Sequence, residues 1–172
     1  MGLFLLAGAA GAFPASITAP QAAFVPTHIL TLTGYNAVPG QTDDTPFITA
    51  SGAYTNPEVV AARSQDLRNE LPFGTIIAID GPTDVQASGT CGYKVVESAI
   101  GYRVIADTMN ARYTKYVDVV FKTMGAATTL GVCPGTTVRV VGFVDIKNPA
   151  NLPKSQAALT ALVEHPLNLA IK

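Results

Sequence analysis

The stretch that decides the fold is GYRVIADTMNARYTKYVDVVF, residues 101–121. It holds two runs of β-branched and other apolar residues, Tyr102–Ala106 and Tyr116–Phe121, separated by a polar connection. Runs of this composition, bounded by turn-forming residues, predict two short strands joined by a loop. One aspartate ends the first run and another lies within the second, so the same stretch is also a candidate for chemistry.

Further strand-like segments lie on both sides of this stretch. Thr27–Tyr35 alternates apolar and polar residues over its first half, as a half-buried strand does. Gly74–Asp80 and Thr136–Val144 are β-branched runs between turn-forming residues, and Gly142 inside the second run predicts a bulge or bend. Five or six short strands predict a mainly β protein built on a small closed barrel, rather than a doubly wound sheet.

Helical patterns are few and short. Asn56–Glu58 has the order of an N-cap followed by proline at the first helical position, which predicts a short helix to about Ser64. Ser155–Glu164 is rich in Ala and Leu and lies between two prolines, which predicts a second short helix.

The composition limits the classes of function. A chain of 172 residues is long enough for one domain with a proper core. Apolar residues make up 48% of the chain and charged residues 13%, which argues against a disordered segment. Because 11 basic residues oppose 12 acidic ones without a basic run, the chain lacks the charge pattern of a nucleic-acid binder.

The first residues are apolar throughout. The stretch Gly2–Phe13 is short for a membrane span, which needs about 20 residues. It suits the apolar region of a signal peptide, with cleavage near Ala19–Ala23. We therefore assign residues 1–23 to a signal peptide or N-terminal anchor, and expect an exported protein of the bacterial cell envelope or extracellular space. A buried N-terminal strand or helix is the alternative, and a membrane is a partner only if the segment is retained as an anchor.

Two cysteines lie in turn-like contexts, Cys91 in GTCGY and Cys133 in GVCPG. In an exported protein we expect them to form one disulfide. Two free buried thiols are the alternative. Two cysteines this far apart, with no histidine near either, do not make a metal site.

The chemistry left open by the sequence is that of carboxyl groups, because the signatures of serine proteases, P-loop proteins, dinucleotide binders and zinc hydrolases are absent from it. Asp107 ends one strand and Asp118 lies in the next. A carboxyl group at the mouth of an apolar barrel tends to stay neutral, and a neutral acid can protonate a glycosidic oxygen. In the alternative, structural interpretation, Asp107 caps the following turn and Asp118 pairs with Arg112 or Lys115.

A second polar patch is the segment of residues 33–52, TGYNAVPGQTDDTPFITASG. A stretch of this kind leaving a strand would line one rim of a barrel and offer hydrogen bonds to a hydroxyl-rich ligand. Ordinary turn formation explains the same residues, and the oxygen-ligand spacing of a calcium loop is absent from the segment. The candidate substrate-binding residues are Tyr35, Thr42, Asp43, Asp44, Thr49 and Ser51, together with Thr108, Asn110 and Arg112 from the polar connection.

The order of these segments resembles the 3D domain, a family named for three aspartates. The resemblance runs from roughly Leu30 to Val144. It rests on residues 33–52, ARSQDLRNELPFGT (62–75), residues 101–121, LGV (130–132) and TTVRVVGF (136–143). It implies a six-stranded double-psi β-barrel with one or two short helices, similar to the C-terminal part of MltA-type lytic transglycosylases and to stationary-phase survival proteins. The barrel would occupy residues 27–146, and residues 147–172 would form an extension with a short helix.

The resemblance also implies roles for three aspartates. Asp107 falls on the family's D-T/D-V motif, which implies the general acid. Asp118 falls on the third aspartate, which would orient Asp107 or raise its pKa by like-charge repulsion. Asp66 is nearest to the first aspartate, at a longer spacing than usual from the LPFGT turn. The connection MNARY (109–113) is bulkier than the glycine-rich segment of the family.

The function that the resemblance implies is that of a peptidoglycan lytic transglycosylase. Asp107 would give its proton to the oxygen between MurNAc and GlcNAc, and then take a proton from the MurNAc 6-hydroxyl as a 1,6-anhydro ring closes. No metal or organic cofactor is needed, and the partner is the glycan strand of peptidoglycan. Two alternatives are a non-catalytic cell-wall glycan-binding barrel, which the bulky MNARY connection favours, and a structural envelope protein that only displays loops.

Overall fold

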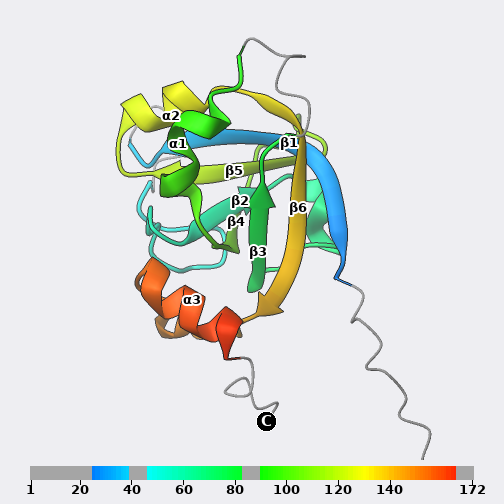
Figure 1. Ribbon diagram of the computed structural model, residues 1–172. Coiled ribbons are helices and arrows are strands. Elements are labelled where there is room, and N and C mark those ends of the chain that lie inside the picture. The colour runs from blue at the N-terminus through cyan, green and yellow to red at the C-terminus, as the bar shows by residue number, and fades with distance from the viewer. Residues whose placement is uncertain (1–24, 39–45, 83–89, 166–172) are drawn as a thin grey trace, which may run out of the picture.

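The computed structural model describes residues 25–38, 46–82 and 90–165, and its centre is a closed barrel (Figure 1). Within these residues six strands follow one another around the barrel in the order β1-β5-β2-β4-β3-β6. The predicted mainly β fold with a six-stranded closed barrel is therefore confirmed. The strands are β1 (Thr27–Asn36), β2 (Val60–Arg63), β3 (Thr75–Asp80), β4 (Arg103–Thr108), β5 (Tyr116–Phe121) and β6 (Cys133–Phe143).

The strand pairing fits a double-psi barrel. β1 runs parallel to β5, and β2 runs parallel to β4. The remaining pairings around the barrel are antiparallel. The short strand β2 lies between β4 and β5. A residue of β4 and a residue of β5 that pair with the same residue of β2 therefore lie in one row across the three strands.

In the described part of the chain, buried apolar residues form two clusters. The first joins the barrel interior to helices α1 (Tyr93–Ile100) and α2 (Met124–Leu130). The second joins the other side of the barrel wall to helix α3 (Gln156–Glu164) through Leu152 and Leu159. Figure 1 shows α1 and α2 side by side at one end of the barrel and α3 at the opposite end. The helices thus cover the two ends and leave part of the wall exposed.

Three short α-helices accompany the barrel within the described residues, where the sequence predicts one or two. The helix predicted at the C-terminal end is confirmed as α3, with Ser155 as its N-cap accepting a hydrogen bond from the amide of Ala158. None of the helices in the described ranges is long and apolar enough to cross a membrane.

The helix predicted to begin at Pro57 and end near Ser64 is wrong, because Val60–Arg63 forms strand β2. Asn56 does cap a turn, since its side chain accepts a hydrogen bond from the amide of Glu58 at 2.9 Å. The chain then leaves the turn as a strand whose four residues are all buried and pair with β4 on one edge and β5 on the other. Tertiary pairing overrides the weak helical preference of this short segment.

The bulge predicted at Gly142 is confirmed. Ile76 of β3 pairs with Gly142, and the next residue Ile77 pairs with Val140, so one residue of β6 is extra at this point. A Cβ atom on Gly142 would come within 3.3 Å of the Ile76 side chain, which explains why a residue without a side chain suits the site.

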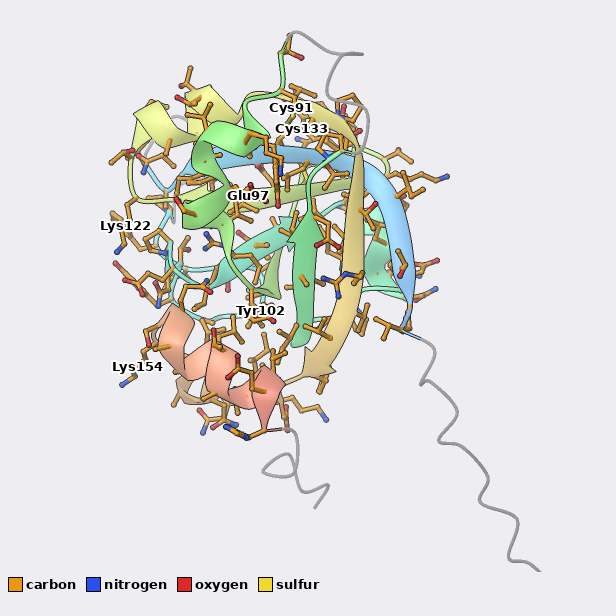
Figure 2. All side chains as sticks on the ribbon, viewed as in Figure 1. Cys91, Glu97, Tyr102, Lys122, Cys133 and Lys154 are labelled. Carbon is orange, nitrogen blue, oxygen red and sulfur yellow. A yellow bond between two sulfur atoms is a disulfide. The ribbon has the colours of Figure 1, made fainter. Side chains whose placement is uncertain are left out.

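Cys91 and Cys133 form the predicted disulfide (Figure 2). The bond joins the residues just before α1 to the first residue of β6. An isolated bridge between Cys91 and Gly131 reinforces the same junction. A disulfide is typical of proteins that fold in an oxidising compartment, which fits an extracellular protein.

Gln156 holds α3 against the barrel. Its side-chain oxygen accepts a hydrogen bond from the amide of Tyr102 at 3.1 Å, and its side-chain nitrogen donates to the carbonyls of Tyr102, at 2.7 Å, and of Glu58. One amide side chain therefore satisfies three backbone groups next to β2 and β4.

Replacing Gln156 by alanine is expected to lower the free energy of unfolding by about 1–3 kcal/mol, because it leaves part-buried backbone groups without partners. Urea denaturation of the variant measures this loss. Gln65→Ala is the matched control, since Gln65 is exposed and its replacement should change stability by about 0.5 kcal/mol or less. Equal losses in the two variants would contradict the stabilising role given to the Gln156 hydrogen bonds.

Candidate functional site

A groove of about 980 Å³ opens over the wall that β1, β5, β2 and β4 form. One rim is a hairpin of residues 46–55, closed by the bridge between Ile48 and Tyr54 and by the hydrogen bond from the Thr49 amide to the Ala53 carbonyl. We call it the rim hairpin. The other rim is the connection between β4 and β5, which contributes Met109, Asn110, Arg112 and Tyr113.

The floor of the groove is a row of residues that crosses four strands. Thr33 of β1 pairs with Asp118 of β5, and Ala62 of β2 pairs with Asp118 on one side and with Asp107 of β4 on the other. Since neighbouring strands lie about 4.8 Å apart, the Cα atoms of the two aspartates are about 10 Å apart. The side chain between them is only the methyl group of Ala62, which leaves open space above it. We call these four residues the cross-strand row.

A bulge in β4 brings Asp107 into this row. Ala61 pairs with Ile105, and the next residue Ala62 pairs with Asp107, so Ala106 is the extra residue. Without it Ala62 would face Ala106, and Asp107 would point to the other side of the sheet, because successive side chains alternate between faces. The bulge therefore redirects the aspartate into the groove, a common use of bulges near functional sites.

The carboxyl group of Asp107 accepts hydrogen bonds from three directions. The amides of Ala50 and Thr108 both donate to Oδ1 at 2.8 Å, and the Tyr35 hydroxyl donates to Oδ2 at 3.3 Å. The Ala50 amide belongs to the rim hairpin, and the neighbouring Ser51 amide donates to the Ala106 carbonyl at 3.1 Å. Asp107 thus ties the rim hairpin to β4.

Asp118 has a very different environment. The residue as a whole is half-buried, and its carboxyl group accepts a hydrogen bond from the Thr33 hydroxyl at 2.9 Å. Burial raises the pKa of Asp118 to about 7; the Thr33 hydrogen bond opposes this shift and the charge of Asp107 adds to it. No ion pair in the described residues involves Asp118, so the pairing with Arg112 or Lys115 considered above is wrong.

The Tyr35 hydroxyl contacts Asp107 and is influenced by the charge of Asp118. Burial, followed by the charges of Asp107 and Asp118, raises the pKa of Tyr35 well above its usual range. The phenol therefore stays neutral and available as a hydrogen-bond donor.

Two tyrosines line the rim opposite the hairpin. The rings of Tyr113 and Tyr116 are tilted against each other with centroids 5.2 Å apart. The guanidinium of Arg112 lies 4.9 Å from the centroid of Tyr113 and donates to its hydroxyl at 3.0 Å. Neither tyrosine is among the candidate residues predicted from the sequence. Alternation in the strand could have identified Tyr116, because it lies two residues before Asp118 and therefore on the same face.

Most of the candidate residues predicted from sequence meet at this groove. Ser51 is not among the residues that line the groove, but its hydroxyl is 3.0 Å from that of Thr49, which does line it. Thr42, Asp43 and Asp44 lie outside the described residues. The candidates that line the groove are Tyr35, Thr49, Asp107, Thr108, Asn110, Arg112 and Asp118.

Asp66 is not among the residues that line the groove. It is exposed on the 3-10 helix η1 (Gln65–Arg68), where its Oδ2 accepts a hydrogen bond from the amide of Lys115 at 3.0 Å. Lys115 has a φ of 58°, in the left-handed region, so Asp66 holds a strained turn of the β4–β5 connection. The structure therefore brings together two of the three aspartates and separates the third from them.

The described residues contain no group of three or more His, Cys, Asp or Glu side chains that could hold a metal ion. The chemistry that this groove offers is that of two dissimilar carboxyl groups, a phenol and several hydroxyl and amide groups.

The fold and the groove define a β-barrel with an acidic cleft. No protein-family model and no curated protein match the chain. Among solved structures it is similar to a mutant of the Clavibacter michiganensis expansin in complex with cellohexaose, at 14% sequence identity and a TM-score of 0.38. The match covers 68% of this chain and 51% of that one, so the chain spans about half the length of the expansin. Membership in the 3D-domain family stays a prediction.

Proposed function

We propose that the groove binds the glycan strands of peptidoglycan. The observation that carries the proposal is the lining of the groove, which combines hydroxyl, amide and carboxyl groups with the rings of Tyr113 and Tyr116. A sugar chain presents hydroxyl groups at its edges and C–H groups on its faces, so it needs both kinds of contact. Convergent polar groups beside aromatic surface are typical of ligand sites.

The disulfide supports a location outside the cytoplasm, where peptidoglycan is found. Cys91 and Cys133 are bonded, and such bonds persist in oxidising compartments outside the cytoplasm. The cell wall lies in such a compartment. Export by the N-terminal segment 1–23 remains part of the proposal, because those residues lie outside the described ranges.

Cleavage of the bound strand is a second candidate function, and the raised pKa of Asp118 favours it. A carboxyl group that is still protonated near neutral pH can act as a general acid. In a lytic reaction the proton passes to the glycosidic oxygen as the bond from C1 to that oxygen breaks. The MurNAc 6-hydroxyl then bonds to C1 and returns its proton to the carboxylate, so water is not consumed.

Sedimentation with insoluble peptidoglycan sacculi tests binding. Tyr113→Ala is expected to weaken retention about tenfold, because loss of one stacking contact worth about 1.4 kcal/mol changes an equilibrium constant by that factor. Asp145→Asn is the control, since Asp145 is exposed and does not line the groove. The proposal would be contradicted if the unmodified protein were not retained by the sacculi. Equal retention of the unmodified protein and of Tyr113→Ala would also contradict it.

Mass spectrometry of the material released from the same sacculi separates the two candidates. A lytic enzyme releases products with 1,6-anhydro ends, and this release should fall at least about 100-fold in Asp118→Asn, as for loss of a general acid. A binding module releases none, while its sedimentation with sacculi persists.

A further inference from the structure

We infer that the connection between β4 and β5 carries a carboxylate-binding subsite, in which the guanidinium of Arg112 holds a carboxylate displayed by the glycan strand. In peptidoglycan this group occurs on the stem peptide, and on the lactyl group of MurNAc where the stem has been removed. The inference rests on the glycan binding proposed above and adds the class of glycan that the groove selects, one that carries negative charge.

Arg112 is the only cation among the described residues that line the groove. The other charged residues of that lining are Asp107 and Asp118. None of the salt bridges found in the described ranges involves Arg112. An arginine that has no acidic partner in the described part of its own chain can pair with a carboxylate that a ligand brings.

The guanidinium is held in place by a neighbouring ring. It lies 4.9 Å from the centroid of the Tyr113 ring, and its Nη2 donates to the Tyr113 hydroxyl at 3.0 Å. Within the described residues its remaining donors have no hydrogen-bond partner. The planar fork of an arginine can give a carboxylate two parallel hydrogen bonds. Because the ring already limits the rotation of this side chain, less conformational freedom is lost when a ligand binds.

The backbone that carries Arg112 is fastened at both ends of the connection. At the first end, the amide of Met109 donates to the carbonyl of Arg63 at 2.9 Å. At the other end, the amide of Lys115 donates to Oδ2 of Asp66 at 3.0 Å. The guanidinium is therefore presented from a preorganised segment, which lowers the cost of binding. Asp66, although outside the groove, takes an indirect part in presenting it.

The two signs of charge lie at different levels of the groove. Asp107 and Asp118 belong to the floor, whereas Arg112 is exposed on the rim. A sugar chain on the floor offers neutral rings and hydroxyl groups to the aspartates, while the groups that branch from the chain extend toward the rim. A carboxylate on such a branch meets Arg112 without approaching the carboxyl groups of the floor. A neutral sugar chain lacks this contact.

Isothermal titration calorimetry of the full chain with three soluble fragments of equal length tests the subsite. The fragments are a peptidoglycan glycan with its stem peptides, the same glycan stripped of its stems so that the lactyl carboxylate is free, and a neutral chitin fragment. Arg112→Gln should weaken binding of a charged fragment about fivefold, as for an exposed ion pair of fixed geometry, and should leave chitin binding unchanged. A loss with the stemmed fragment alone assigns the carboxylate to the stem, and a loss with the stripped fragment assigns it to the lactyl group.

Lys115→Gln is the matched control. It removes the same charge from the same connection, but Lys115 is not among the described residues that line the groove, and its amide still donates to Asp66. This variant should change each affinity by less than about twofold, because an exposed charge at a distance is screened. In nitrogen-15 NMR of the unmodified protein, the Nε–H signal of Arg112 should shift with the charged fragment and stay in place with chitin.

Three results would overturn the subsite alone. They are equal losses in Arg112→Gln and Lys115→Gln, an equal loss of chitin and of charged fragments in Arg112→Gln, and binding of all three fragments that does not depend on Arg112. Absence of binding by every fragment would overturn the proposed glycan binding and the subsite with it. Failure of the inference and failure of the proposed function are therefore distinguishable.

Discussion

Replacement of Cys91 and Cys133 by serine is expected to lower the free energy of unfolding by about 4 kcal/mol. The two residues are 42 positions apart, and in the chain-entropy account a cross-link over a loop of this length removes about that much freedom from the unfolded chain. Urea denaturation of the double variant measures the loss. Addition of a thiol reductant to the unmodified protein should reproduce it, and the double variant should not respond to the reductant.

The same replacement is expected to affect one end of the groove. Val132, which lines the groove, directly precedes Cys133, and its amide donates to the carbonyl of Thr90 at 3.2 Å. Faster amide hydrogen exchange at Val132 than in the disulfide-bonded protein would show this loosening. Unchanged stability in the double variant would contradict the structural role given to the bond.

The second large effect concerns pH. The free energy of unfolding is expected to fall by roughly 2–4 kcal/mol between about pH 4 and pH 7 because of Asp118, since one unit of pKa corresponds to about 1.4 kcal/mol. The pKa of Asp118 is about 7 in the folded protein, above the ordinary value near 3.9 of an unfolded chain. Between these values the folded state binds the extra proton. This stabilisation is complete below the lower value and is lost as the pH rises through the upper one.

Urea denaturation of Asp118→Asn over this pH range isolates the contribution of Asp118, because the amide cannot titrate. The difference in unfolding free energy between the two proteins should change with pH by the amount given above. Asp80 contributes below this window, since the hydrogen bond from Arg139 lowers its pKa. Asp145→Asn should keep the pH dependence of the unmodified protein. An equally steep dependence in Asp118→Asn would refute the raised pKa of Asp118.

The sequence predicts well the strands whose side chains are strongly β-branched. Tyr116–Phe121 is found with the predicted bounds, and β1, β3, β4 and β6 lie within a few residues of theirs. β2 could not be found in this way, because VAAR has little strand preference and becomes a strand only by pairing on both edges. Helices α1 and α2 escaped prediction because they are short and gain their stability by packing on the barrel.

In the candidate site, too, the residue types could be predicted from the sequence, whereas their arrangement could not. The residue types indicated an acidic cleft, but the alignment of Asp107 with Asp118 depends on strand register and on the bulge at Ala106. No local pattern in the sequence predicts the strand register or the bulge. The contrast between the two carboxyl groups also arises from tertiary structure, because the Ala50 amide and the Thr33 hydroxyl reach them from distant parts of the chain. The separation of Asp66 from the pair has the same cause.

Titration of a soluble peptidoglycan glycan fragment into the nitrogen-15-labelled protein, followed by amide NMR, tests the central claim most directly. Binding in the groove predicts that the largest shifts fall on the cross-strand row and on Arg112, Tyr113 and Tyr116, with weaker binding in Tyr113→Ala. A chain of glucose units serves as the comparison ligand and should bind more weakly. Absence of shifts at millimolar fragment, or shifts confined to the separate apolar cleft beside Tyr54 and Leu152, would contradict the account.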